Sequence, residues 1–384
     1  FNIQRSLANN SVNYKEKPDV GTFMREWLSL YDSKSGERGV YSSMSAQRHT
    51  EKLNIQRKNK DGTYVQRRVA KEDFGTNPCS EIILRSREFC NLSEVVIRRE
   101  DTRESLKEKV RIATIIGTFQ STLTEFKYLS REWKRNCEEE RLLGVSLTGI
   151  MDNSLTNGSK KGLENFLEDL KDVAYETNKE WADKLGINSA AAITCVKPSG
   201  TVSQLVDSAS GIHARHSPYY IRTVRADNKD PLCQMMKERG FPNEPDITKP
   251  NHTTVFSFPM KSPKGAICRN EMTAWKQLSL WHTYAKHWCE HKPSVTVSVK
   301  EDEWVNTAAW VYDNFDDISG ISFLPFSDHT YRQAPYQDCT EKEYNELSKQ
   351  IPKEANWEEL TKYESKDYTV ASQEMACTGN SCEI

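Results

Sequence analysis

The sequence predicts an α/β protein with a largely parallel sheet. Near the C-terminus, "SVTVSVK" alternates as a strand, a helix is expected from Glu301 to Tyr312, and "GISFLPF" reads as a further strand. Earlier, "AAAITCVKPSG" changes from a buried strand to a turn and a helix start. Strands that alternate with helices in this way favour helices packed on a mostly parallel sheet.

Three helices are predicted from local pattern. The segment "VGTFMREWLSLYDSKSG" indicates a short helix that ends near Gly36. Longer amphipathic helices are expected over residues 104–126 and 161–185, and in the second of these apolar side chains recur at spacings of three and four. Strands are expected at "CSEIIL" and "FCNLSEVVI".

Residues 43–71 form a polar, basic stretch that we expect to be an exposed insertion or hairpin. Within it, "NKDGTYV" carries the Asp-Gly pair that is typical of a hairpin turn. Residues 371–384, with small polar side chains around Gly379, are predicted to be a mobile tail.

Composition limits the classes of function. The 384 residues carry a formal charge of −2, which gives no reason to expect direct nucleic-acid binding. No apolar run is long enough for a membrane span, and "FNIQRSLANN" lacks the features of a secretory signal. We therefore expect a cytoplasmic protein in which the ten cysteines are reduced or redox-active. The start at Phe1 suggests a fragment, a processed product or a split polypeptide.

The stretch "GTNPCSEIILRSREFCNLSE" holds the first candidate site. Pro78 favours an extended or turn conformation before Cys79, and on a strand Asn77, Cys79 and Glu81 would share one face. A thiol beside a carboxylate suits a nucleophile or radical site with a general base. Cys90, eleven positions after Cys79, could reach the same substrate. The alternative is a structural cysteine in the core.

Two further motifs carry chemistry. In "ACTGNSC", Cys377 and Cys382 flank a Gly-Asn turn and are placed to exchange a disulfide with an internal partner and an external reductant. In "VKPSGTVS", the backbone N–H groups and hydroxyls of a helix start offer an anion site, although an ordinary helix cap would look the same. Its residues are Pro198, Ser199, Gly200, Thr201 and Val202.

A metal site is not predicted. "WHTYAKHWCEHK" contains His282, His287, Cys289 and His291, but on a helix only His287 and His291 would share a face. An amphipathic helix with exposed histidines is the preferred interpretation.

These motifs together resemble the ribonucleotide reductases. "NPCSE" followed by "CNLSEV" is similar to the finger-loop signature of that superfamily, and the C-terminal dithiol also matches. Several motifs resemble the adenosylcobalamin-dependent class II enzymes of the monomeric type, and the resemblance runs from "LANNSV" to the tail. The further matching motifs are "RLLGVSLTGIMD", "VKPSGTVSQL", "SGIHARHSPYYIRTVR" and "GISFLPF" with "HTYRQAPYQD".

The resemblance implies a role for each residue. Cys79 would become a thiyl radical that removes the 3′-hydrogen of the ribose, Glu81 would be the base on the 3′-hydroxyl, and Asn77 would bind the substrate. Cys90 would be one of two reducing thiols, and Cys377 and Cys382 would restore them with a thioredoxin-like protein. Residues 198–202 would hold the phosphates of a ribonucleoside di- or triphosphate.

The resemblance also implies a fold and its missing part. Residues 1–370 would be the C-terminal portion of a ten-stranded α/β barrel with Cys79 on a central loop, and residues 240–370 would include the part that contacts cobalamin. The second reducing cysteine and the effector region lie upstream in the family. We therefore expect an N-terminal polypeptide to complete the enzyme.

Three alternatives stay open from the sequence. A separate metal-containing subunit could supply the radical in place of adenosylcobalamin. The chain could instead be a non-catalytic reductase fragment, or a zinc-binding structural or interaction module that uses the scattered cysteines with His287 and His291.

Overall fold

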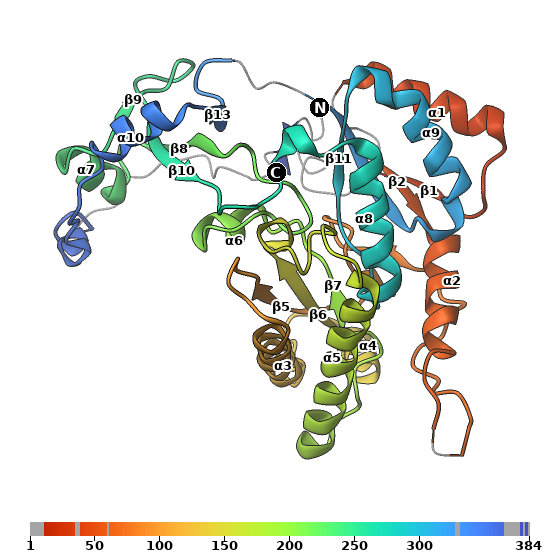
Figure 1. The fold of residues 1–384 in the computed structure, drawn as a ribbon. Helices are drawn as coiled ribbons and strands as arrows, with labels where there is room; N and C mark the ends of the chain where they lie inside the picture. The colour runs from red at the N-terminus through yellow and green to blue at the C-terminus, as the bar shows by residue number, and fades with distance from the viewer. Residues whose placement is uncertain are drawn as a thin grey trace.

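The computed structural model describes residues 11–34, 39–59, 61–326, 331–364, 377–378 and 381–382. Helices and strands form a main body and an arm that extends to one side of it (Figure 1). The predicted α/β class is confirmed. Among the described residues, none of the helices combines the length and apolar character that a membrane span requires.

A parallel three-stranded sheet lies at the centre of the lower body in Figure 1. Every residue of its middle strand is buried, because helices cover one face and a loop described below packs on the other. The strands, in spatial order, are β5 (Asn91–Val96), β6 (Leu143–Thr148) and β7 (Thr194–Cys195).

Two long helices pack beside this sheet and against each other. α3 (Arg103–Gln120) begins with a capping box at Thr102, and it ends six residues earlier than the sequence predicts. α5 (Leu163–Leu185) matches its prediction and buries the leucines of its apolar stripe. α4 (Arg131–Glu140) leads into β6.

A second sheet is mixed. β11 and β12 run parallel, as do β1 and β2, whereas β2 and β12 are antiparallel. In order, its strands are β1 (Val12–Tyr14), β2 (Val40–Ser42), β12 (Gly320–Pro325) and β11 (Thr296–Val299). The associated helices are α1 (Val20–Ser33), α2 (Ser43–Asn54), α8 (Ala274–His287) and α9 (Trp304–Asp313).

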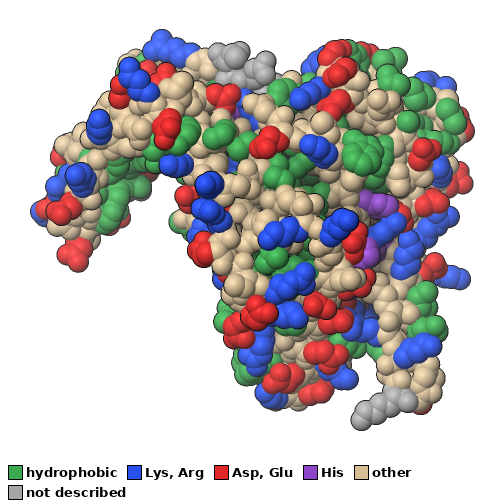
Figure 2. Space-filling view, viewed as in Figure 1, with side chains coloured by type: hydrophobic (Ala, Val, Ile, Leu, Met, Phe, Trp, Pro, Cys, Tyr) green, Lys and Arg blue, Asp and Glu red, His purple; other side chains and the backbone are tan. Residues whose placement is uncertain are grey.

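The arm is built on a wholly antiparallel sheet, which the prediction of a largely parallel sheet did not include. Figure 2 shows it standing out from the body with a hollow beneath it. Its strands, in order, are β13 (Tyr336–Asp338), β8 (Tyr219–Asp227), β10 (Thr253–Lys261) and β9 (Asn243–Pro245). Its helices are α7 (Pro231–Glu238) and α10 (Glu341–Ser348).

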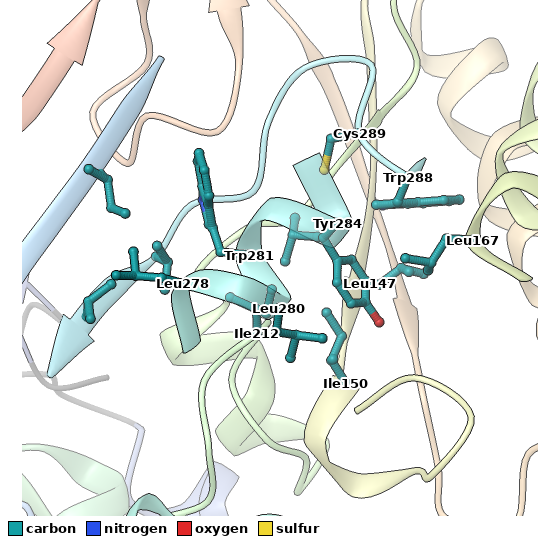
Figure 3. Close-up of a cluster of buried hydrophobic side chains, with 14 of the residues drawn as sticks. Leu147, Ile150, Leu167, Ile212, Leu278, Leu280, Trp281, Tyr284, Trp288 and Cys289 are labelled. Carbon is teal, nitrogen blue, oxygen red and sulfur yellow. The ribbon is translucent and has the colours of Figure 1, made fainter. Parts of the chain in front are cut away.

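The main core joins both sheets of the body through α8. Figure 3 shows Trp281, Tyr284 and Trp288 extending from α8 and the turn after it into a cluster that includes Leu147 of β6 and Leu167 of α5. The two indole N–H groups donate to backbone carbonyls of Pro293 and Cys195 at 2.8 Å, so these large side chains are buried without unpaired donors.

The stretch 43–71 departs from its prediction. The Asp-Gly turn does form, with an antiparallel bridge between Lys58 and Tyr64. The stretch is not a wholly exposed insertion, because one face of α2 is buried and Arg68 is only 6% exposed. Arg68 pairs with Glu88 and Glu140, which compensates its burial.

The remaining elements are short. Strands β3 (Gly75–Thr76) and β4 (Ile83–Leu84) form a hairpin, and β14 (Cys377–Thr378) pairs with β15 (Ser381–Cys382). The six-residue helix α6 (Gly200–Leu205) follows β7. Single-turn 3₁₀ helices are η2 (Ile150–Asp152), η3 (Arg269–Glu271), η4 (Glu301–Glu303) and η5 (Phe315–Asp317), and η6 (Trp357–Lys362) is longer.

The ten-stranded barrel that the resemblance implies is not seen in the described part of the chain, whose strands form five separate sheets. Most of the predicted tail, residues 371–384, lies outside the described residues. In the part that is described, the strand register sets Cys377 opposite Cys382.

Candidate functional site

Only the last two residues of the predicted strand "CSEIIL", Ile83 and Leu84, form a strand, and the residues before them are the turn of a hairpin. β3 and β4 pair, and the chain between them turns tightly, with the Ser80 N–H donating to the Asn77 carbonyl at 2.9 Å. Ser80 has a φ of 68°, in the left-handed region. Because period-two alternation does not hold through such a turn, the expectation that Asn77, Cys79 and Glu81 share a strand face is wrong.

The Asn77 side chain stabilises this turn. Its amide oxygen accepts a hydrogen bond from the Ile82 N–H, five residues on, at 3.0 Å, and so closes the turn from the inside. We call residues 77–82 the finger loop. Asn77 therefore has a local structural role, and the substrate contact that the resemblance implies for it stays a prediction.

The finger loop places Cys79 and Glu81 in different surroundings. Cys79 is exposed in this chain, whereas Glu81 is 1% exposed. Neither carboxylate oxygen of Glu81 has a hydrogen-bond partner among the described residues. A buried carboxylate that lacks hydrogen bonds is costly, so an unpaired one inside a protein is typical of a site that binds something else.

Cys90 lies beside the finger loop. It precedes β5, and a Cβ placed on Gly144 of β6 would be 3.2 Å from the Cys90 sulfur and 3.1 Å from a methyl of Ile82. Burial raises the pKa of the Cys90 thiol, and the nearby negative charge of Glu81 raises it further. The structure thus places Cys90 beside the finger loop, where the charge of Glu81 acts on its thiol, whereas a substrate shared by the two residues stays a prediction.

A second buried thiol, Cys195 on β7, belongs to the same neighbourhood. It is fully buried, and burial together with the charges of Glu81 and Cys90 raises the pKa of its thiol. Sequence reasoning gave Cys195 no role, since nothing in "ITCVKP" distinguishes it from a core cysteine.

The predicted phosphate loop forms a turn and a helix start. Ser199 has a φ of 56°, and α6 begins at Gly200. The Ser199 hydroxyl donates to Glu94 of β5, and burial raises the pKa of that carboxyl. The Ser199 hydroxyl, one of the donors proposed for phosphate, is therefore already bound to Glu94, a residue that no sequence motif indicated. Binding by residues 198–202 stays a prediction.

The segment after α8 contradicts the expected helix with exposed histidines. α8 ends at His287, and His291 lies beyond it, fully buried. Its Nδ1 accepts from the Ile83 N–H at 3.3 Å and its Nε2 donates to the Leu143 carbonyl at 2.9 Å. Burial lowers the pKa of His291 to about 3, so the ring is neutral and joins the finger-loop hairpin to β6.

His287 and His291 therefore do not share a helix face. His287 pairs instead with Glu168 of α5, at 2.7 Å. Within the described residues, no three His, Cys, Asp or Glu side chains are grouped as metal ligands would be.

Two more residues of this segment were missed. Glu290 is 1% exposed and forms a two-point ion pair with Arg67. Lys292 is 2% exposed, and its ammonium group donates to the Ser80 hydroxyl at 2.5 Å. A charged "EHK" triplet looks like an exposed helix end, and only tertiary contacts show that it supports the finger loop.

Comparison with known proteins gives one consistent result. No protein-family model matches the chain. It is 28% identical over 286 residues to the adenosylcobalamin-dependent ribonucleoside-triphosphate reductase of Euglena gracilis, a match that covers 74% of this chain and 38% of that protein. The protein of that name from Lactobacillus acidophilus is 28% identical over 341 residues, which covers 81% of this chain and 45% of the relative.

A further relative comes from Dictyostelium discoideum and is named as a probable enzyme of the same kind. It is 31% identical over 281 residues, 71% of this chain and 36% of its own length. A crystal structure of a B12-dependent, class II ribonucleotide reductase matches with a TM-score of 0.74 and 22% identity, covering 94% of this chain and 52% of that one. The matches thus span less than half of each curated relative.

Proposed function

This chain is homologous to the adenosylcobalamin-dependent ribonucleoside-triphosphate reductases, and we propose that it carries the finger loop and reducing thiol of such an enzyme. The reaction would convert ribonucleotides to 2′-deoxyribonucleotides for DNA synthesis in the cytoplasm. The observation that carries the proposal is the buried carboxylate of Glu81, which has no hydrogen-bond partner among the described residues and whose charge acts on the Cys90 thiol.

The proposed chemistry divides among the side chains of the site. The Cys79 thiyl removes the 3′-hydrogen of the ribose while Glu81 accepts the proton of the 3′-hydroxyl. The 2′-hydroxyl leaves as water, and Cys90 with a second thiol supplies two electrons and becomes a disulfide. Cys79 then returns the hydrogen to C3′. Each turnover therefore consumes one dithiol and releases one water.

The acid–base states of the site suit these roles. A raised thiol pKa keeps Cys90 protonated, so that it can deliver hydrogen as well as electrons. Glu81 is shielded from water, which strengthens its interaction with a bound hydroxyl. Residues 198–202 would hold the substrate triphosphate, and the Gly200 start of α6 supplies backbone N–H groups there.

Adenosylcobalamin, when bound, would supply the oxidising equivalent that makes the Cys79 thiyl. The residues present fit this cofactor in one respect: Cys79 is exposed in this chain, so a large cofactor can approach its sulfur. We assign the cofactor contact to residues 240–370, which include much of the arm. The names of the relatives favour this source over a separate metal-containing subunit.

Two partners complete the proposal. An N-terminal polypeptide would supply the second reducing thiol and close the site over Cys79. A thioredoxin-like protein would recharge the dithiol of Cys377 and Cys382, which the described strands set opposite each other.

Complementation tests the function. The chain is mixed with an N-terminal half from a class II relative, adenosylcobalamin, a dithiol and a ribonucleoside triphosphate, and deoxynucleotide is measured. We expect product with the wild-type chain, none with Cys79→Ala, and none without the N-terminal half. Product from the chain alone would contradict the need for an N-terminal polypeptide. A zinc module would instead hold one zinc per chain, and a non-catalytic fragment would support turnover equally well with Cys79→Ala.

A further inference from the structure

We propose that Lys292 is a positioning residue of the candidate site, which fixes the tip of the finger loop through Ser80 and offsets the charge of Glu81. The inference rests on the proposed function only in taking Glu81 as the base. No sequence motif pointed to this lysine.

Backbone and side-chain contacts join one short segment to the tip of the loop. The Lys292 ammonium donates to the Ser80 hydroxyl at 2.5 Å, and the Lys292 N–H donates to the Glu81 carbonyl at 3.2 Å. The Ser294 hydroxyl donates to the Cys79 carbonyl at 2.6 Å. Residues 79, 80 and 81 are thus each bound from the segment 292–294, and the ammonium group contacts the residue in the left-handed conformation.

The neighbouring strand leaves room for the lysine. A Cβ on Gly320 of β12 would lie 1.8 Å from the Lys292 nitrogen and 2.5 Å from the Ser80 oxygen. Any other residue at 320 would therefore displace this contact. The ring of Tyr41 lies 5.3 Å from the ammonium nitrogen and closes another side. Lys292 thus occupies a slot that only glycine at position 320 permits.

The charge of Glu81 offsets part of the cost of burying the lysine. A fully buried ammonium group is costly unless a negative charge lies near it. Burial lowers the pKa of Lys292 to about 7, and the charge of Glu81 acts in the opposite direction. The Lys292 N–H binds the Glu81 carbonyl and both side chains are buried, so the ammonium group and the carboxylate share one buried region without a hydrogen bond between them.

A double-mutant cycle tests the pairing without any turnover. Wild type, Lys292→Met, Glu81→Gln and the double variant of the full chain are compared at about pH 6, where the lysine is protonated. The readouts are the thermal midpoint and the amide exchange of residues 77–84. Lys342→Met, on an exposed lysine of α10, is the matched control.

We expect Lys292→Met to speed exchange of residues 77–84 by roughly tenfold, since the contact with Ser80 is lost and an unpaired buried carboxylate remains. The midpoint of Lys292→Met also gains from removal of a buried charge, so the midpoints are compared only as the coupling between the two substitutions. Adding Glu81→Gln should recover at least half of the lost exchange protection. Equal losses in the two backgrounds would mean that Lys292 only fills space and would overturn the proposal.

A second variant covers the case in which Lys292→Met does not fold. Ser80→Ala removes the acceptor and keeps the ammonium, so exchange should rise within residues 77–84 and stay unchanged in α5. Unchanged exchange at the loop would also overturn the proposal. None of these readouts needs nucleotide reduction, so a failed complementation assay and a failed Lys292 test remain distinguishable.

Discussion

Raising the pH should stabilise this chain through Lys292. The pKa of a lysine side chain is 10.5 in the unfolded chain and about 7 at this position, because burial of the ammonium group lowers the pKa more than the negative charge of Glu81 raises it. Between these two values the unfolded state binds more protons than the folded state. The free energy of unfolding therefore rises with pH over this window, and the cost of burying the charge is fully present below it.

The size of the effect follows from the shift. A change of about 3.5 pKa units at about 1.36 kcal/mol each sets a ceiling of about 4 to 5 kcal/mol on the gain between neutral pH and about pH 10.5. Relaxation around the lysine and water entry reduce this figure, so we expect about half of it to be observed.

Urea unfolding at a series of pH values measures the gain. Other lysines, tyrosines and cysteines also titrate in this range, so the quantity of interest is the difference between wild type and Lys292→Met. That difference in the free energy of unfolding should change steadily in favour of wild type as the pH rises. The free energy of unfolding of Lys342→Met should stay parallel to that of wild type at every pH. If the free energies of unfolding of wild type and Lys292→Met changed in parallel with pH, the pKa of Lys292 would not be lowered by folding.

Three further predictions follow from single contacts. Gly320→Ala should destabilise the chain by about 1 to 3 kcal/mol through collision with Lys292, whereas Gly75→Ala, with no atom within 4 Å of the added Cβ, should be near neutral in thermal unfolding. The pKa of His291 falls to about 3, so between about pH 3 and pH 6.5 only the unfolded state binds a proton at this residue. The free energy of unfolding of wild type should therefore fall as the pH is lowered through this window, and that of His291→Asn should fall less steeply. Cys90→Ser should abolish multiple turnovers with an external dithiol in the complemented enzyme, with product formation as the readout, and undiminished turnover would exclude Cys90 as a reductant.

Local sequence pattern predicted those helices and strands that depend mainly on residues close to one another in the sequence. The helix over 161–185 and the strands at 294–300 and 320–326 follow from periodicity, and the structure has them at nearly the same bounds. The antiparallel arm was missed in part because β13 pairs with β8 from more than a hundred residues away, which no local pattern shows.

The candidate site was predicted by residue type more successfully than by geometry. Glu81 and Cys90 do lie together, but through a turn with Ser80 in the left-handed region and not through strand alternation. Nothing in "EHK" signalled that His291 and Lys292 are buried, because their burial depends on partners in the hairpin and in β12 that are distant in sequence.

The role proposed for Cys79 is tested most directly by the fate of the 3′-hydrogen of the substrate. A ribonucleoside triphosphate labelled with deuterium at C3′ is reduced by the complemented enzyme, and the rate and the label in the product are followed for wild type and Cys79→Ala. We expect slower reduction of the labelled substrate by wild type and no deoxynucleotide from Cys79→Ala. Reduction by Cys79→Ala at the wild-type rate would contradict it.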